Sequence, residues 1–151
     1  MSTIVIETFI AASPERCFDM ARDVTLHTAS AGRTRERAVA GVTAGLIGLG
    51  QTVTFEAIHF GIRQRLTARV TRFEPPQRFV DEMVQGVFVS FGHVHEFEPA
   101  HGGTLMRDTL TWQSPCGLLG SLADFLFLKR YLAWFIRERG LHLKRVAESA
   151  A

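Results

Sequence analysis

Two histidines and an aspartate stand on neighbouring predicted strands, where they could support proton transfer. His93 and His95 fall at the same alternate positions as the apolar residues of segment 87–98, and Asp108 does so in segment 104–113. Because successive side chains of a strand point to opposite faces, all three are expected on the apolar face of a sheet. If the connecting turn has four residues, His95 lies directly opposite Asp108, with Cβ atoms ~5 Å apart.

This pair supports two interpretations, one chemical and one structural. In the first, Asp108 orients His95 as a general base or as a hydrogen-bonding group for a ligand, and the two are the candidate catalytic residues. In the second, they form a buried structural pair that satisfies both groups. A slip of one residue in the turn would separate them, because it moves every side chain to the other face.

Other arrangements of reactive residues have weaker support in the sequence. The His93-x-His95 spacing can bind a metal, but a site needs a third ligand, and the sequence offers none that can be placed on that face. We therefore expect no metal and no cofactor. Asp81 and Glu82 are adjacent, so only one can face inward, and the pattern does not decide which. No Ser/His/Asp or Cys/His triad is indicated.

The remaining candidate residues describe a largely apolar ligand site. The chain has 12 Phe against 1 Tyr and 2 Trp, so most aromatic side chains lack a polar atom, which suits an apolar interior or cavity. Ligand sites of this kind are concave and mostly apolar with a few polar groups. The predicted ligand-binding residues are Phe55, His59, Gln64, Leu66, Phe91, His93, His95, Met106, Trp112, Phe127, Tyr131 and Phe135.

The elements that must position these residues can be read from the chain of 151 residues. Ser13 followed by Pro14 predicts the start of a short helix, and residues 24–29 form a second helical turn. Apolar residues at helical spacing predict a long C-terminal helix over about 123–146, preceded by a tether at 118–122. Alternating or β-branched runs predict strands at 4–10, 34–39, 51–59, 62–73, 78–84, 87–98 and 104–113.

These elements predict a single α+β domain over residues 1–151. Short connections make the later strands antiparallel neighbours, and a twisted seven-stranded sheet can curl around the long helix. The space between sheet and helix is either filled by side chains or left as a pocket. The glycine-rich loop 41–50 lacks phosphate-loop spacing and is either a slack connection or a lid over an apolar opening.

The order of elements and a series of short motifs resemble a known superfamily. The motifs are Ile10–Phe18, Gly50–Phe55 with His59-Phe60-Gly61, Phe73–Glu82, His93–Phe97, Gly103-Thr104 with Asp108, and Pro115–Gly120. Together they resemble the helix-grip fold of the START-like (SRPBCC, birch-pollen-allergen-like) superfamily, and most of all its small bacterial polyketide cyclase/dehydrase-like proteins. The resemblance spans nearly the whole chain and implies the fold, but the superfamily includes carriers, sensors and enzymes.

Composition indicates which kinds of partner and which cellular compartment are expected. The net charge of +2 is too small and too scattered for nucleic-acid binding. Cys17 and Cys116 are far apart and indicate free thiols in a reducing, cytoplasmic setting. The start of the chain has no signal-peptide pattern, and the apolar stretch 118–128 is too short for stable membrane insertion. Homodimerisation stays open, and the outward arginines of 62–73, such as Arg63, Arg65 and Arg69, form either a solvated face or a basic stripe.

Three functions follow from these features. The first is binding of a hydrophobic small molecule, such as a lipid, a polyketide or another aromatic or isoprenoid-like ligand, between sheet and C-terminal helix. The second is an aromatase/cyclase- or dehydratase-like enzyme that uses His95 and Asp108. The third is a non-catalytic protein-interaction module with a solidly packed interior.

Overall fold

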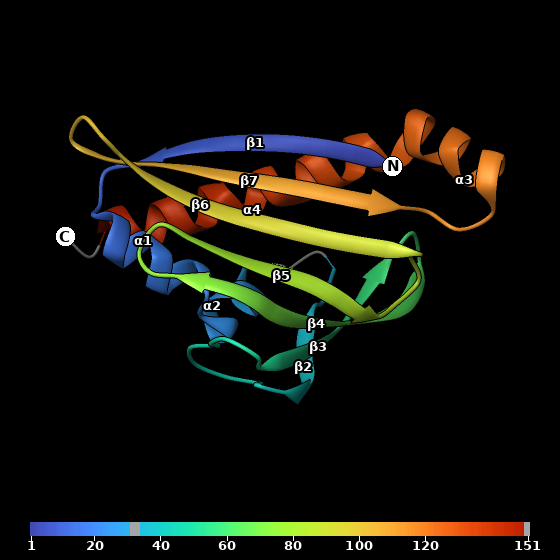
Figure 1. The fold of residues 1–151 in the computed structure, drawn as a ribbon, viewed down its shortest axis with the longest axis horizontal. Coiled ribbons are helices and arrows are strands. Elements are labelled where there is room, and N and C mark those ends of the chain that lie inside the picture. The colour runs from blue at the N-terminus through green and yellow to red at the C-terminus, as the bar shows by residue number, and fades with distance from the viewer. Residues whose placement is uncertain (31–33, 150–151) are drawn as a thin grey trace.

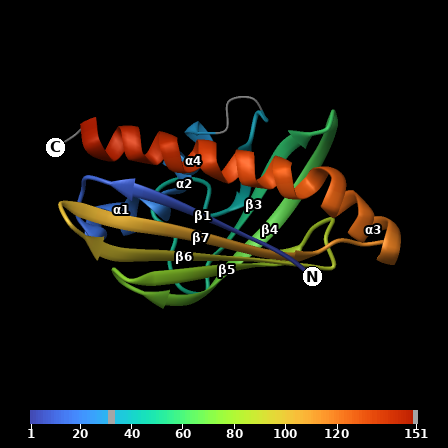
Figure 2. The ribbon, with the colours of Figure 1, turned by 90° about the horizontal axis from the view of Figure 1, so that it is seen from above.

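The computed structural model describes residues 1–30 and 34–149. Within these residues, a seven-stranded antiparallel sheet has the order β1-β7-β6-β5-β4-β3-β2. A continuous run of helical residues from Gly117 to Ser149 ends the described chain and crosses one face of the sheet (Figures 1 and 2). The elements are β1 (Ser2–Ile10), α1 (Pro14–Ala21), α2 (Val24–Ala29), β2 (Arg37–Gly41), β3 (Thr52–His59), β4 (Ile62–Glu74), β5 (Arg78–Gln85), β6 (Ser90–Ala100), β7 (Gly103–Gln113), α3 (Gly117–Ala123), the π-helical segment η1 (Asp124–Leu128) and α4 (Lys129–Ser149).

The α+β helix-grip prediction is therefore confirmed, with shifts at several boundaries. The strand predicted at 34–39 is Arg37–Gly41, and the one predicted at 87–98 is Ser90–Ala100. The predicted tether at 118–122 is wrong, because these residues form α3. Every residue of that stretch except Gly120 is exposed, so it shows no apolar face from which a helix could have been recognised.

The first helix begins where its sequence predicts. The Ser13 hydroxyl accepts a hydrogen bond from the backbone N–H of Arg16 at 3.2 Å, and Pro14 occupies the first helical position. Helix α1 buries Phe18, whose ring meets those of Phe73, Phe79 and Phe97 at centroid distances of 5.3–5.5 Å. These edge-to-face contacts close one end of the space between sheet and α4.

Helix α4 lies close against the sheet at Gly140. A Cβ atom at this position would lie 2.8 Å from the Thr8 hydroxyl oxygen of β1. The sequence marks Gly140 as a weak point, since glycine costs about 1 kcal/mol in a helix relative to alanine. The structure gives the reason for glycine here: it lets the helix approach β1. Nearby, Leu143 and Ala147 are buried against the same core.

Candidate ligand-binding cavity

A cavity of about 190 Å³ lies between the inner face of the sheet and the helices. Strands β3 to β6 form one wall, α4 forms another, and the α1–α2 region closes the side. Most of the predicted ligand-binding residues line it: Phe55, His59, Gln64, Leu66, Phe91, His93, His95, Tyr131 and Phe135. A cavity of ~150 Å³ already holds a molecule such as benzene, so this space admits at least one aromatic ring.

Three of the predicted residues lie elsewhere. Met106 and Trp112 are buried in the core beside the cavity, and neither lines it. Phe127 is 65% exposed and points away from it. The physical reason is that Phe127 lies within the π-helical segment η1, whose wider turn breaks the regular α-helical spacing that would otherwise place Phe127 on the stripe of Tyr131 and Phe135.

A chain of two aspartates and two histidines, all buried except the partly exposed Asp81, runs along the sheet wall. The register pairs His95 with Asp108 across β6 and β7, as the four-residue turn predicts. His95 Nε2 lies 2.7 Å from Asp81 Oδ2, and its Nδ1 lies 3.3 Å from Asp108 Oδ1. His93 Nε2 lies 2.8 Å from the same Asp108 oxygen. Asp81 is thus the acidic residue of the Asp81–Glu82 pair that faces inward.

The two histidines of this chain have opposite charge preferences. Burial disfavours a charged His95, but hydrogen bonds with Asp108 and Asp81 outweigh it and raise its pKa to about 9. Burial and the neighbouring His95 lower the pKa of His93. His95 is therefore an imidazolium that donates both N–H groups to carboxylates. His93 is neutral, and its Nδ1 has no hydrogen-bond partner among the described residues.

The same cluster supplies the third candidate metal ligand that the sequence analysis did not find. Asp81, His93 and His95 offer ligand atoms within 4.8 Å of one another. However, the two imidazoles are stacked with centroids 3.7 Å apart and 20° between their planes. A metal binds in the plane of the ring, so near-parallel rings do not converge on one ion. The observed geometry favours the hydrogen-bonded chain.

A second polar cluster, absent from the sequence analysis, faces the cavity from α2, the residue before β2, and α4. Glu36 Oε1 accepts from Arg139 at 2.9 Å and lies 3.2 Å from His27 Nε2. Burial alone would raise the pKa of Glu36, but Arg139 and His27 lower it to about 2. Arg139 Nε is buried with no hydrogen-bond partner in the described chain. Arg139 stands on the apolar stripe of the helix, and that unusual position is the signal in the sequence.

A third polar contact lies near the N-terminal end of α4. His59 Nδ1 and the Tyr131 hydroxyl are 2.5 Å apart. Burial lowers the pKa of His59 and raises that of Tyr131, so both groups are neutral near pH 7. Phe60 packs on Tyr131 with ring centroids 4.6 Å apart. This pair offers a neutral donor or acceptor to a ligand.

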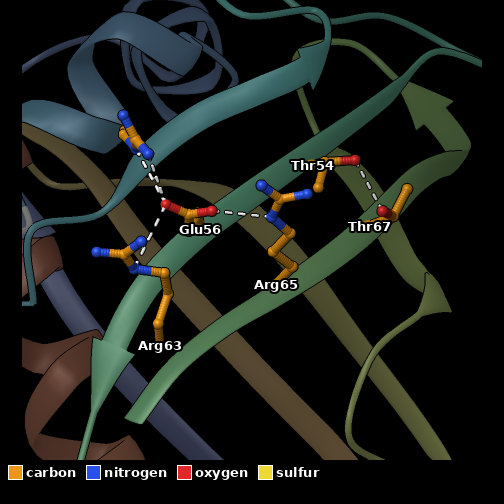
Figure 3. Close-up of polar contacts among 6 residues, drawn as sticks. Thr54, Glu56, Arg63, Arg65 and Thr67 are labelled. Atoms are coloured by element: carbon orange, nitrogen blue, oxygen red, sulfur yellow. Dashed lines mark hydrogen bonds and ion pairs between the residues drawn. The ribbon is translucent and has the colours of Figure 1, made fainter. Parts of the chain in front are cut away.

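Arg37 of β2 and two outward arginines of β4, Arg63 and Arg65, converge on the carboxylate of Glu56. Glu56 Oε1 accepts from Arg37 at 2.7 Å, and Glu56 Oε2 accepts from Arg65 at 2.8 Å, while Arg63 lies 3.9 Å away (Figure 3). Hydrogen bonds from Arg37 and Arg65 lower the pKa of Glu56 to about 2. The basic stripe, one of the two alternatives for these arginines, is therefore partly neutralised at this point.

The glycine-rich loop is fixed to the helices rather than free. Ile47 N–H donates to Arg22 C=O at 3.1 Å, and Val24 N–H donates to Gly45 C=O at 2.8 Å. Ile47 is buried and lines the cavity, whereas Leu49 is exposed. The loop therefore contributes to the cavity wall.

A curved antiparallel sheet that holds a C-terminal helix over an internal cavity defines a helix-grip protein. The chain belongs to the polyketide cyclase / dehydrase and lipid transport family, which matches residues 1–148. No curated protein sequence matches it significantly.

Solved structures share the fold over nearly the whole chain. Protein TTHA0849 from Thermus thermophilus is 20% identical with a TM-score of 0.81, and the match covers 99% of both chains. A START superfamily protein from Mycobacterium smegmatis is 13% identical with a TM-score of 0.74, again over 99% of both. Major latex-like protein 151 from Panax ginseng is 9% identical with a TM-score of 0.67, over 97% of both.

Proposed function

We propose that the protein binds a hydrophobic small molecule between the sheet and α4. The observation that carries this proposal is the cavity of about 190 Å³, whose walls combine aliphatic and aromatic side chains with a few buried polar groups. The family to which the chain belongs includes lipid-transport proteins, which supports the same interpretation. The ligand is an aromatic or isoprenoid-like molecule with an apolar body.

The polar groups select the functional groups of that ligand. Asp81, Asp108, the protonated His95 and the neutral His93 together carry a net charge of −1, which favours a hydroxyl or amine donor over an anion. His93 Nδ1 is the acceptor in this cluster that is free of partners among the described residues. We therefore expect a ligand with a phenol, enol or amine at the end that meets β5 and β6.

Filling the cavity tests the binding proposal. Ala68 lines the cavity from the middle of β4 and is 5% exposed. Ala68→Phe is expected to weaken binding of the neutral fluorescent probe N-phenyl-1-naphthylamine by at least about tenfold, since overpacking a site costs about 1–3 kcal/mol. Val5→Phe, on the outer face of β1, is the matched control and should bind as the wild type does. Equal binding by wild type and Ala68→Phe would place the probe outside the cavity and contradict the proposal.

A second candidate is a proton-transfer enzyme, favoured by the hydrogen-bonded Asp–His chain in the cavity wall. In this interpretation Asp108 remains the orienting residue. His95, with both nitrogens held by carboxylates, acts as a fixed positive charge, and His93 is the base. With a linear poly-β-ketone as substrate, His93→Gln is expected to reduce kcat by about 100-fold or more, a far larger change than its effect on probe binding. If the wild type did not turn the substrate over, the enzyme proposal would fail and ligand binding would remain as the proposed function.

A further inference from the structure

The helical segment that precedes α4 exposes nearly all of its apolar side chains. Leu118 and Phe125 are 90% and 76% exposed, and Phe127 is 65% exposed. The segment from Gly117 to Leu128 contains a single charged residue, Asp124. That carboxylate is buried and accepts hydrogen bonds from Ser2 and Ser114 at 3.1 Å and 2.6 Å. The exposed surface of the segment therefore carries no charge.

Two strand connections extend this surface. In the β3–β4 turn, Phe60 and Ile62 are more than 60% exposed, and Val87 and Val89 are more than half exposed between β5 and β6. Both connections lie at the same end of the molecule as α3 (Figures 1 and 2). We call the exposed apolar residues of 60–62, 84–89 and 117–127 the apolar rim. Exposed apolar residues gathered at one end of a molecule are typical of an interaction site.

The apolar rim adjoins the cavity. Phe60 and Val87 belong to the rim and also line the cavity, as does Leu128, which directly follows the rim. Phe60 meets Tyr131 of α4 at a centroid distance of 4.6 Å, so the turn and the start of α4 stand side by side. The cavity therefore reaches the surface at this end, and whatever covers the rim also covers its opening.

We propose that the apolar rim docks on the surface of an anionic lipid bilayer. The longest part of the rim is helical, so its backbone hydrogen bonds are satisfied internally and tolerate an apolar environment. Lys129 and Arg130 follow the segment directly and are exposed, which places two cations beside it at the level of lipid headgroups. A second copy of the chain packed on the same face by two-fold symmetry would instead bring the same cations toward each other.

The mode of contact is interfacial. Among the described residues, no helix combines the length and the apolar character that a bilayer crossing requires. The exposed leucine and phenylalanine side chains are long enough to enter the boundary between headgroups and acyl chains. Docking in this way would open the cavity toward the membrane, where a hydrophobic ligand is most concentrated.

Vesicle co-sedimentation tests this proposal. The wild type should bind vesicles of phosphatidylcholine with phosphatidylserine more tightly than vesicles of phosphatidylcholine alone. Leu118→Asp and Phe125→Asp are each expected to weaken binding by at least about tenfold, because each removes a large apolar side chain from the contact. Lys129→Ala should weaken binding to the anionic vesicles alone, by about fivefold.

Val5→Asp is the matched control for these variants. Val5 is as exposed as several rim residues but lies on β1, so its replacement should leave vesicle binding unchanged. Failure of the wild type to bind anionic vesicles would overturn the proposal. So would a dimer in analytical ultracentrifugation that Phe125→Asp dissociates, because a second copy would then cover the rim. Probe binding by Phe125→Asp in solution should match the wild type, which separates this test from that of the cavity.

Discussion

Replacing Asp108 with alanine is expected to lower the free energy of unfolding by about 3–5 kcal/mol at pH 7. The reason is that Asp108 Oδ1 is a shared acceptor for His93 and His95, all three residues being buried. Without it, the imidazolium of His95 keeps Asp81 as its only carboxylate partner, and His93 loses its hydrogen bond. Urea denaturation followed by far-UV circular dichroism measures the change.

Glu98→Ala provides the control for this prediction. Glu98 is a carboxylate on the neighbouring strand β6, but its side chain is 64% exposed and lies 3.8 Å from Arg107. Exposed ion pairs of this kind contribute about 0–1 kcal/mol. If Asp108→Ala and Glu98→Ala changed the stability equally, the buried chain would not stabilise the fold as described.

The second large effect is a loss of stability above neutral pH that depends on His95. In the folded protein its pKa is about 9, against a reference value of 6.5. A group with a raised folded pKa stabilises fully below its unfolded pKa and loses that contribution as the pH rises through the folded value. The stabilisation is thus present below pH ~6.5 and is largely lost by pH ~9, and the difference is on the order of 3 kcal/mol.

His95→Gln isolates this contribution. The variant should show a flatter dependence of unfolding free energy on pH between about 6.5 and 9, whatever its overall stability. At lower pH both proteins should lose stability, because His27 and His93 have lowered pKa values and the unfolded chain binds their protons more tightly. Parallel alkaline declines in wild type and variant would contradict the assignment of a protonated His95.

Much of the fold could be predicted because each element has a local signal. Ser13 with Pro14 marks the start of α1, and alternation places Phe55 and His59 on the inner face of β3. The pairing of His95 with Asp108 follows from turn length, which local sequence also determines. The segment 118–122 could not be assigned in this way, because a helix that exposes apolar residues on most of its surface has no amphipathic period.

The candidate site was less predictable because its contacts join distant segments. Asp81 and Glu82 have apolar neighbours on both sides, and irregular pairing between β4 and β5 removes a simple register. The register also does not show that Asp108 would be shared by two histidines. The contact of His27, Glu36 and Arg139 joins α2, the residue before β2 and α4, which are far apart in the sequence. The signal that the sequence does contain is Arg139, a charged residue on an otherwise apolar helical stripe, whose burial requires an acidic partner.

The aromatic packing around Phe18 has a consequence for the size of the guest. Phe18 contacts Phe73, Phe79 and Phe97, and α4 packs directly on β1 at Gly140. These contacts close that end of the molecule. A longer molecule can therefore gain room only in the opposite direction, past Tyr131 and Phe60. Selectivity for ligand length beyond the first ring or isoprene unit should therefore depend on the residues at the open end of the cavity, and not on those around Phe18.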